Sequence, residues 1–551
     1  MLKPKLFSTL ESYNWKQFQD DFMSGIIVGV VALPLAIAFA IASGVGPERG
    51  LITAVVAGFL ISVFGGSRVQ IGGPTGAFVV IVYNIVQKYG IEGLLITTLL
   101  GGILLVLMGF ARFGGVIKFI PYPVIVGFTS GIALVIFTSQ IKDFLGLAIE
   151  GLPADFIEKI IVCVVNIRSV NFYSLLLGAS TILIIITWQK ITKKIPGSLV
   201  ALIIITAAAY ILKLPVETIG SRFGEIPHSL PPPHLPEINP ELLKQLFPAA
   251  MTVAILAGIE SLLSATVADG MIGGKHRSNM ELIAQGIANI VSPLFGGMPA
   301  TGAIARTVTN IHNGGRTPVA GIVHALTLLC IMLFFGKLAV YIPLSCLAGI
   351  LMIIAYRMSE WHSFVMVLKS PRSDAAVLLA TFALTVLIDL TVAIEIGMVL
   401  SAFLLIRRLS LATNMEIFTK EFVDEEDRGD PDGIGKVKIP DGVEIFEVNG
   451  PFFFGITSTF LETIKNIEKK PKVRIIRMRH VSSIDASALN VLQQVARDSK
   501  KSGIRLILSG VHIQPLEAMK RVGLVEEIGA ENILDNIDDA IKRSGEILSA
   551  F

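Results

Sequence analysis

Long apolar runs separated by short polar turns occupy residues 22 to 408 of this 551-residue chain. A helix that crosses a hydrocarbon core of about 30 Å needs about 20 apolar residues. Some of the candidate runs reach that length, and others are shorter or rich in Gly and Pro. The runs lie at 22–42, 51–64, 71–86, 93–111, 120–139, 173–188, 198–212, 248–266, 280–297, 301–312, 318–336, 340–356, 374–390 and 392–406. The pattern predicts an α-helical polytopic membrane protein with 14 spans.

The pattern changes after residue 408. Residues 409–438 are acidic and contain Gly and Pro, which is typical of a solvated linker. Residues 439–551 then alternate strand-like and helix-like segments, with VEIFEVNG, KVRIIRMRHV and IRLILSGV as the predicted strands. Such alternation predicts an aqueous α/β domain behind the membrane domain of residues 22–408.

Two short stretches of the membrane domain resemble each other. FGGSRVQIGGPTGAF ends at residue 78, and FGGMPATGAIA ends at residue 305. A Pro-rich loop at 224–245 divides the spans into two halves, about 22–212 and 248–408, with seven spans each. An odd number of spans gives the second half inverted polarity, and the two stretches then fall in the third and tenth spans. Interrupted segments at matching positions of inverted repeats indicate a transport site.

These two stretches predict an anion-binding site. If Pro74–Ala77 and Thr301–Ile304 begin half-helices in mid-membrane, their free N–H groups and positive dipole ends converge. The predicted ligand groups are Thr75, Gly76 and Ala77 from one copy and Gly302, Ala303 and Ile304 from the other. Arg306, one turn further, adds a fixed positive charge. The alternative is that the glycines only allow close helix packing.

Glu260 lies inside the apolar run 248–266, and an ionisable residue at that depth indicates a functional site. It could exchange a proton or hold a cation, with Ser264 one turn further as a hydroxyl ligand. Alternatively, Glu260 and Arg306 form an ion pair that only locks spans eight and ten together. Both interpretations can hold at once.

Composition supports the membrane assignment and excludes other classes. The chain is 53% hydrophobic and 16% charged, with a net charge of +3 and a mean hydropathy of +0.71. No CxxC pair, metal-ligand cluster or nucleophile–base pair is present in the sequence, so we expect no enzyme activity, no metal, no cofactor and no nucleic-acid partner. Residues 1–21 are polar without a signal-peptide cleavage site. Basic clusters such as Arg407 and Arg408 favour both termini on the cytoplasmic side of the inner (plasma) membrane.

The tail contains one motif of interest, Ile484-Asp485-Ala486-Ser487, at a predicted strand-to-helix turn. Asp485 or Ser487 could be a regulatory site, with the Ser487 hydroxyl exposed. Either residue could equally be a simple helix N-cap.

The chain resembles the SulP family of anion transporters, which include relatives of pendrin and prestin and the cyanobacterial bicarbonate transporters. The resemblance is carried by VALPLAIAFAIASG in span one, GGPTGAF in span three, and the block GIESLLSATVADGMIGGKHRSNMELIAQGIANIVSPLFGGMPATGAIARTVTN through spans eight to ten. The tail from 439 to 551 is similar to the STAS domain. Together these segments cover nearly the whole chain.

The resemblance implies a seven-plus-seven inverted repeat like that of the uracil permeases. Spans one to four and eight to eleven would form a core domain and the others a gate domain. It further implies an elevator-like mechanism and a homodimer. The anion would lie near Thr75 and the backbone of 302–304, and a coupling sodium near Glu260, Ser264 and Gly302. The STAS domain would bind a regulatory protein or nucleotide, and Ser487 matches a residue that is phosphorylated in related domains.

We therefore expect a secondary active transporter of small inorganic anions, with sulfate the first candidate and bicarbonate the second. Coupling to H⁺ or Na⁺ is expected at Glu260, where the family's sodium-using members carry an acidic residue. The alternatives are a C4-dicarboxylate carrier, and an uncoupled anion channel or sensor.

Overall fold

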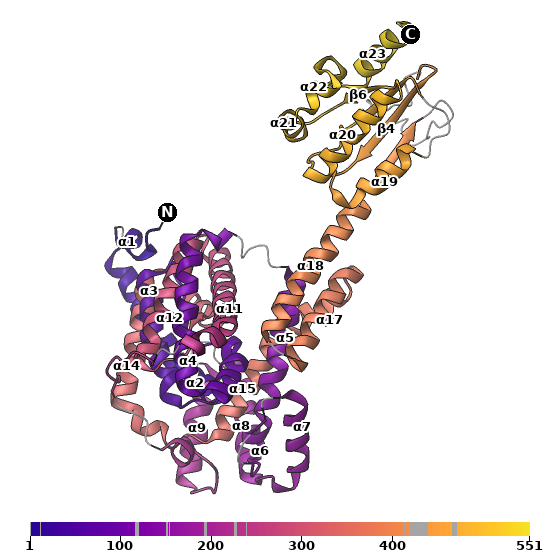
Figure 1. The fold of residues 1–551 in the computed structure, drawn as a ribbon. Coiled ribbons are helices and arrows are strands. Elements are labelled where there is room, and N and C mark those ends of the chain that lie inside the picture. Colours follow the sequence, from indigo (N-terminus) through magenta and orange to yellow (C-terminus); the bar gives the residue numbers. More distant parts are fainter. Residues whose placement is uncertain are drawn as a thin grey trace. The chain divides into compact units, whose positions relative to one another are not determined.

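The computed structural model describes most of the chain, and the arrangement of its elements is drawn in Figure 1. The described residues are 2–11, 13–115, 121–149, 152–153, 155–191, 196–224, 229–237, 240–388, 390–412, 414–418, 439–465 and 471–550. The chain separates into two compact units, Met1–Ser401 and Ala402–Phe551. Each unit is described by itself.

The first unit is helical in both sequence halves. The helices of the first half are α1 (Lys5–Leu10), α2 (Trp15–Ala42), α3 (Pro47–Phe64), α4 (Val79–Phe110), α5 (Tyr122–Ser139), α6 (Ile141–Leu145), α7 (Phe156–Val165), α8 (Phe172–Ile191), α9 (Gly197–Ile211) and α10 (Ile219–Phe223). Those of the second half are α11 (Pro240–Ile272), α12 (Ser278–Val291), α13 (Ile304–His312), α14 (Pro318–Ala339), α15 (Leu344–Met358), α16 (Trp361–Leu368), α17 (Arg372–Leu387) and α18 (Leu390–Ala412), the last of which runs into the second unit.

Length and hydropathy indicate which helices could cross a membrane. Six described segments are long and apolar enough to span a membrane, namely Trp15–Ala42, Pro47–Phe64, Gly76–Phe110, Tyr122–Leu145, Pro240–Ile272 and Leu344–Leu368. Three shorter apolar helices lie at Phe172–Trp188, Gly197–Ile211 and Pro318–Phe334. The long helix α4 contains a non-helical residue, Gly90 (φ 68°), so it consists of two helices joined at a kink. This kink lies between the predicted spans 71–86 and 93–111.

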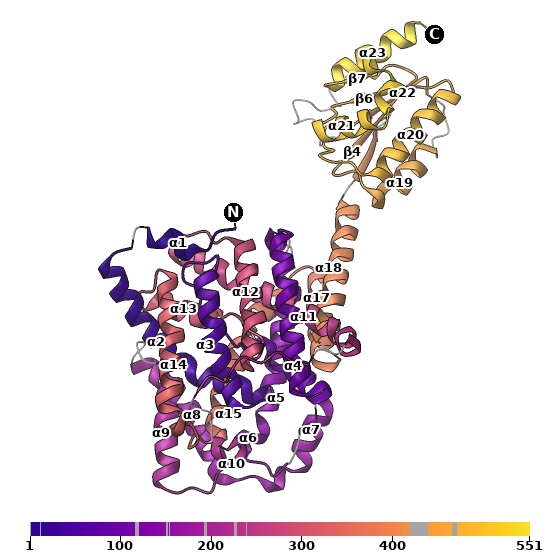
Figure 2. The same ribbon diagram turned by 60° about the vertical axis from the view of Figure 1, so that its left-hand side comes forward.

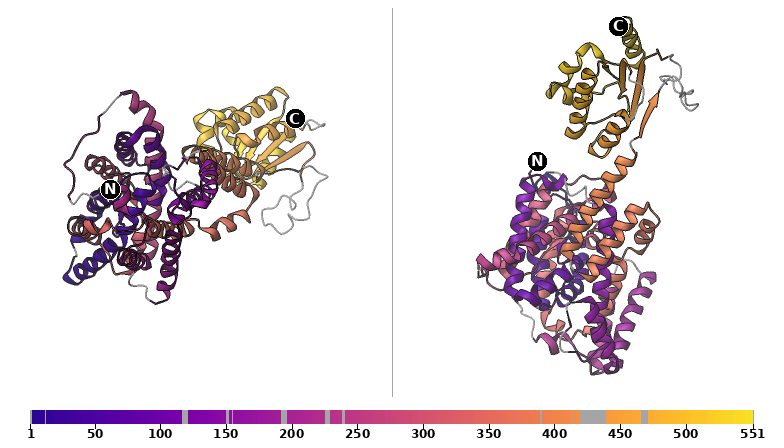
Figure 3. Two further views of the ribbon diagram at one scale, coloured as in Figure 1. Left: turned by 90° about the horizontal axis from the view of Figure 1, so that it is seen from below. Right: turned by 45° about the vertical axis from the view of Figure 1, so that its right-hand side comes forward.

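Most helices of the first unit fall into two groups by their packing contacts, and Figures 2 and 3 show this unit in further views. One group contains α2, α3, α4, α11, α12, α13 and α14, and the other contains α5, α6, α8, α9, α15, α16 and α17. Each group takes helices from both halves of the sequence. Helix α2 packs on α14, for example, and α4 packs on α11 and α12. This is the division into core and gate domains that the resemblance predicts.

The second unit is built on a five-stranded sheet in the order β3-β4-β5-β6-β7. Its strands are β3 (Asn414–Phe418), β4 (Val443–Asn449), β5 (Val473–Arg477), β6 (Arg505–Ser509) and β7 (Ile533–Leu534), and its helices after α18 are α19 (Phe454–Lys465), α20 (Ala486–Lys501), α21 (Ile513–Arg521), α22 (Leu524–Ile528) and α23 (Ile537–Ser549). Strands β4 to β7 are parallel, and β3 is antiparallel to β4. Apolar clusters fill both faces, with α19, α20, α21 and α22 on one and α23 on the other.

The sheet differs from the sequence prediction at its edge. Residues 414–418 form β3, although they lie within the segment 409–438 that the composition predicts to be a linker. The strand has a physical reason that composition does not reveal, because all five of its residues pair with β4 in register, from Asn414 with Asn449 to Phe418 with Ile445. Residues 419–438 of the predicted linker lie outside the described residues.

Candidate functional site

Two very short strands join the two sequence halves inside the core group. Strand β1 (Gly72–Gly73) pairs antiparallel with β2 (Thr301–Gly302), and the Ala303 amide also donates to the Ile71 carbonyl at 2.9 Å. Gly73 and Gly302 of this contact each have a side chain of another residue where a Cβ would be. A Cβ on Gly302 would overlap the Gln70 side chain, and Gly73 (φ +149°) has the Arg306 guanidinium where its own Cβ would be. The pairing thus brings the two similar stretches together.

A helix begins directly after each short strand. After β1, extended Thr75 (φ −130°, ψ 162°) precedes the 3-10 turn η1 (Gly76–Phe78), which continues into α4. After β2, Ala303 (φ −96°, ψ 116°) precedes α13. At the starts of η1 and α13, no side chain of the described residues caps the first turn. The sequence predicts helix from Thr301, whereas the structure has strand at 301–302 and helix from Ile304, because β1 holds those two residues extended.

Arg306 lies between the two helix starts and is 2% exposed. Its Nη2 donates to the Pro74 carbonyl, so it ties α13 to the segment before η1. Its Nη1 has no hydrogen-bond partner in the described part of the chain. A buried charge normally has a full set of partners, and an exception calls for an explanation.

Glu260, on α11, contacts the same place from another side. It accepts a hydrogen bond from the Thr75 hydroxyl at 2.8 Å. Between described residues, no ion pair within 4 Å joins Glu260 to Arg306, so the direct pair considered from the sequence is not formed in this structure. Glu260 therefore contacts the helix start at 75 and not the arginine.

Ser264 lies behind this contact. Its hydroxyl donates to the Thr307 hydroxyl at 3.2 Å, and the Ile71 amide donates to the same Thr307 oxygen at 3.1 Å. Ser264 is thus connected through Thr307 to the chain just before β1, and no hydrogen bond joins it to Glu260 among the described residues. Of the predicted site residues, Thr75 and Glu260 are joined directly, whereas Ser264 bonds Thr307 of α13.

The site lies where the two helix groups meet. A Cβ on Gly76 would be 2.9 Å from the Met358 sulfur of α15, 3.3 Å from Phe39 of α2 and 3.5 Å from Ile136 of α5. Gly76 thus faces residues of both groups. Thr75, Ala77 and Ala303 are buried, whereas Ile304 is 38% exposed at the start of α13. Protein therefore does not cover the first turn of α13 completely.

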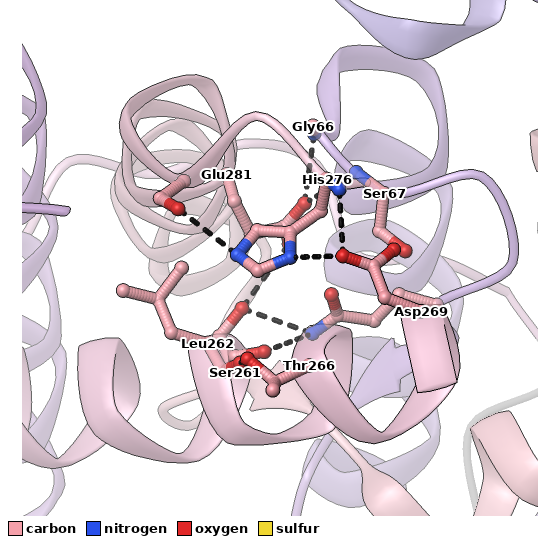
Figure 4. A network of polar contacts seen from close by, with 10 residues as sticks. Gly66, Ser67, Ser261, Leu262, Thr266, Asp269, His276 and Glu281 are labelled. Carbon is pink, nitrogen blue, oxygen red and sulfur yellow. Dashed lines mark hydrogen bonds and ion pairs between the residues drawn. The ribbon is translucent and has the colours of Figure 1, made fainter. Parts of the chain in front are cut away.

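A second carboxylate, Glu281 of α12, fixes the turn that leads into β1 (Figure 4). It is fully buried and accepts from the Gly66 amide at 2.7 Å, the Ser67 amide at 3.0 Å and the Ser261 hydroxyl at 3.1 Å. Gln285 donates a fourth hydrogen bond at 2.8 Å. Beside this network Asp269 accepts from the His276 amide at 2.8 Å and contacts its ring, which anchors the α11–α12 loop.

Glu281 and Gln70 were not among the site residues predicted from the sequence. Gln70 donates to the Ser261 hydroxyl at 2.9 Å and fills the space in front of Gly302. The signal for Glu281 was present, since it is an acidic residue inside the apolar run 280–297. Gln70 stands in a polar turn, so its role depends on a contact that only the fold reveals.

The motif Ile484-Asp485-Ala486-Ser487 in the second unit has a structural role at the start of α20. Asp485 caps α20, since its carboxylate accepts from the Ala488 amide at 2.8 Å, and it also accepts from the Phe454 amide at 3.0 Å. The N-cap interpretation of Asp485 is therefore confirmed. Ser487 is exposed in the first turn of the same helix.

Comparisons with known proteins agree with this architecture. Bacillus subtilis YvdB, provisionally named a sulfate transporter, is 44% identical over 96% of this chain and 98% of its own length. The bicarbonate transporter BicA of Picosynechococcus is 29% identical over 96% of this chain and 95% of its own.

Solved structures show the same fold. The murine Slc26a9 anion transporter in its inward-facing state superposes with a TM-score of 0.86 at 18% identity, covering 99% of this chain and 94% of that one. The transmembrane domain of a cyanobacterial BicA gives 0.62 at 31% identity, over 71% of this chain and 98% of that one.

Family models account for both units. The sulfate permease family model matches residues 18–381, and the STAS domain model matches residues 436–540. These matches cover most of the chain and assign it to transporters rather than enzymes. The chain is a multi-pass membrane protein that belongs to the sulfate permease family and carries a STAS domain behind its transmembrane domain.

Proposed function

We propose that this protein is a secondary active transporter of a small inorganic oxyanion, with sulfate as the first substrate and bicarbonate as the second. Anion transport is the function of its family. The finer statement depends on the site formed where β1 and β2 meet, with Thr75, Gly76 and Ala77 on one side and Gly302, Ala303, Ile304 and Arg306 on the other.

One observation carries the proposal, namely the unpartnered Nη1 of buried Arg306 between two helix starts that no side chain caps. Helix N-termini attract anions through free N–H groups and the positive end of the helix dipole. A guanidinium adds a full charge and donors suited to oxyanion oxygens. A small anion would accept the hydrogen bond that Arg306 Nη1 can donate and that no described residue accepts.

The relatives support the order of substrates. YvdB, which is 44% identical, is named for sulfate, while the BicA proteins, which are named for bicarbonate, are 29% identical. Sulfate carries two charges and four acceptor oxygens, which fits a site with both a guanidinium and two helix starts. A C4-dicarboxylate is the runner-up among transported substrates.

Glu260 is the proposed coupling residue. It contacts Thr75, the residue that begins one of the two helices, so a change in its charge acts directly on the anion site. Protonation removes a negative charge beside the anion, and a sodium ion near Glu260, Ser264 and Gly302 would offset it instead. Either event favours anion binding, which is the basis of symport with H⁺ or Na⁺.

Transport would follow an elevator-like mechanism, in which the helix group that contains α2 and α11 (the core group) moves against the group that contains α5 and α15 (the gate group). The site lies at the boundary of these groups, at Gly76, so relative movement would carry the anion across. We further propose a homodimer in the inner (plasma) membrane with both termini cytoplasmic, and a STAS domain that binds a regulatory protein or nucleotide through the region of Asp485 and Ser487.

Uptake into proteoliposomes tests the proposal. Labelled sulfate, bicarbonate and succinate would each be offered with an imposed proton gradient, an imposed sodium gradient or neither. Accumulation of sulfate that depends on one gradient supports the proposal. Accumulation of succinate alone favours the dicarboxylate alternative, flux without any gradient dependence favours a channel, and binding without flux favours a sensor. In Glu260→Gln the gradient dependence should disappear, and its persistence would remove Glu260 from the coupling role.

A further inference from the structure

The short helix α1 is held where two membrane-spanning helices have their ends. Helix α2 begins at Trp15 and α3 ends at Phe64, and both are long and apolar enough to cross a membrane. The Lys5 amide, in the first turn of α1, donates at 2.9 Å to the carbonyl of Gly65, the residue that follows α3 (Figure 2). Because spans end at the headgroup region of a bilayer, α1 lies at the level of the lipid headgroups.

The loop between α11 and α12 brings a further cation to the same place. Arg277 donates from Nη1 to the Lys3 carbonyl at 2.6 Å and from its amide to the Gly66 carbonyl at 2.9 Å. Arg68 follows two residues after Gly66. Burial first, and then the charges of Arg68 and Arg277, lower the pKa of the Lys5 ammonium, as expected for cations that share one place. Lys5, Arg68 and Arg277 thus form a basic cluster.

The carboxylate near the basic cluster is engaged elsewhere. Asp269 acts on Lys5 through its charge, but it accepts from the His276 amide at 2.8 Å and contacts the His276 ring at 2.7 Å. Between described residues, no ion pair within 4 Å involves Lys5, Arg68 or Arg277. Three neighbouring cations without a carboxylate partner attract an anion.

Large apolar side chains are exposed on the same N-terminal segment. Phe7 and Leu10 of α1 are 51% and 46% exposed, and Trp15 at the start of α2 is 71% exposed. Trp15, Phe18 and Phe22 stack along one face of α2, with ring centroids 5.1 Å and 5.7 Å apart. Aromatic residues gather at membrane–water interfaces. A free anion would use the cations alone, whereas a phospholipid presents a phosphate and acyl chains together and so fits both features.

We propose that the basic cluster binds the headgroup phosphate of an anionic phospholipid such as phosphatidylglycerol. Ammonium and guanidinium groups donate charge-assisted hydrogen bonds to phosphate oxygens. The exposed side chains of α1 and of the start of α2 lie among the upper parts of the acyl chains. This lipid site is separate from the anion site at β1 and β2, and it does not depend on the proposed transport function.

Quenching of a tryptophan by brominated lipids tests the proposal. Full-length protein with its three tryptophans replaced by Phe and with Phe7→Trp would be reconstituted into phosphatidylcholine vesicles that contain brominated phosphatidylglycerol or brominated phosphatidylcholine. We expect stronger quenching by the phosphatidylglycerol. In Lys5→Gln/Arg68→Gln the relative affinity for phosphatidylglycerol should fall about fivefold for each charge removed. Lys190→Gln, which removes one charge at an exposed position of α8, should keep the preference.

Several results would overturn the proposal. Equal quenching by the two lipids would do so, as would a preference that survives the loss of both charges or disappears equally in Lys190→Gln. Quenching by neither lipid would assign the exposed side chains to a protein contact instead. A preference that inorganic phosphate removes, and chloride at the same ionic strength does not, would assign the basic cluster to a free anion. Should the tryptophan-free background not fold, native mass spectrometry decides, because equal retention of phosphatidylglycerol by the unmodified protein and Lys5→Gln/Arg68→Gln overturns the proposal.

Discussion

Buried arginines occur in both units of this protein, and their surroundings differ. In the STAS unit, Arg474 of β5 is paired with Glu444 of β4 at 3.1 Å, and Arg477 with Glu447 at 3.0 Å. These residues face each other in the parallel register of the two strands. In the membrane unit, Arg306 bonds the Pro74 carbonyl and leaves Nη1 without a partner among the described residues.

The difference separates a structural charge from a functional one. A buried ion pair neutralises itself, and removing one partner leaves an uncompensated charge. A buried guanidinium that is not hydrogen-bonded to a carboxylate differs, because it keeps an unsatisfied N–H donor that a bound anion can accept from. The carboxylates show the same contrast, since Glu281 accepts four hydrogen bonds from described residues whereas Glu260 accepts one, from Thr75.

The largest effect is expected from breaking a pair in the STAS sheet. Arg474→Leu leaves Glu444 buried beside an apolar side chain, which should destabilise this unit by about 3–5 kcal/mol. Hydrogen exchange of the β4, β5 and β6 amides in the full-length protein measures the loss. The double variant Glu444→Leu/Arg474→Leu should recover most of the protection. A single variant as stable as the unmodified protein would contradict the structural role of the pair.

Removing Arg306 should lower the affinity for sulfate far more than the stability of the protein. In Arg306→Gln the stability of the empty membrane unit should change little, since a buried charge with an unsatisfied Nη1 is removed but its hydrogen bond to the Pro74 carbonyl is lost as well. Sulfate affinity should fall by about 2–5 kcal/mol, the cost of losing one partner of a buried charge pair. Equilibrium binding of labelled sulfate measures this change. Arg316→Lys, at an exposed position in the loop after α13, is the matched control and should bind normally.

A smaller loss is expected at Glu281. Glu281→Gln keeps the volume and replaces a charged acceptor by a neutral one, which should weaken the turn at Gly66 and Ser67 and destabilise the membrane unit by about 1–3 kcal/mol. Thermal unfolding of the full-length protein checks the size of the loss. Glu395→Gln, at an exposed site on α18, serves as the control. Equal stability of both variants would mean that the turn does not depend on the charge.

The smallest predicted effect is a pH dependence of the STAS unit. Burial raises the pKa of the Glu444 carboxyl above its ordinary value, although the Arg474 guanidinium offsets part of the shift. The folded state therefore binds this proton more tightly than the unfolded state, and the free energy of unfolding falls as pH rises from about 4.3, the ordinary glutamate pKa. Glu444→Gln should flatten this slope in hydrogen exchange. An unchanged slope would assign it to another group.

Much of the fold could be predicted because its signals are local. Apolar runs indicate the membrane helices, and alternating patterns indicate β4, β5 and β6. Gly90 lies in the short polar turn between the predicted spans 71–86 and 93–111, and the break before α13 follows from Gly and Pro in an otherwise apolar segment. Asp485 was one of the two residues considered for the N-cap of α20, and the local preference of helix N-caps for Asp was enough to propose it.

The remainder depends on contacts between distant residues. The pairing of β1 with β2 joins segments more than two hundred residues apart and involves two residues on each side, too few for a periodic signal. Strand β3 was missed because its neighbours are polar and its stability comes from β4. Glu281 does stand out as an ionisable residue in an apolar run, but its partners become visible only in the packed core.

Thermal unfolding of the membrane unit with and without sulfate tests the central claim most directly. A ligand that binds the folded state alone stabilises it by about 2.7 kcal/mol at a hundred times its Kd. The account predicts that sulfate raises the unfolding temperature of the unmodified full-length protein and of Arg316→Lys, and leaves that of Arg306→Gln unchanged at the same concentration. Equal stabilisation of Arg306→Gln would show that the anion binds elsewhere.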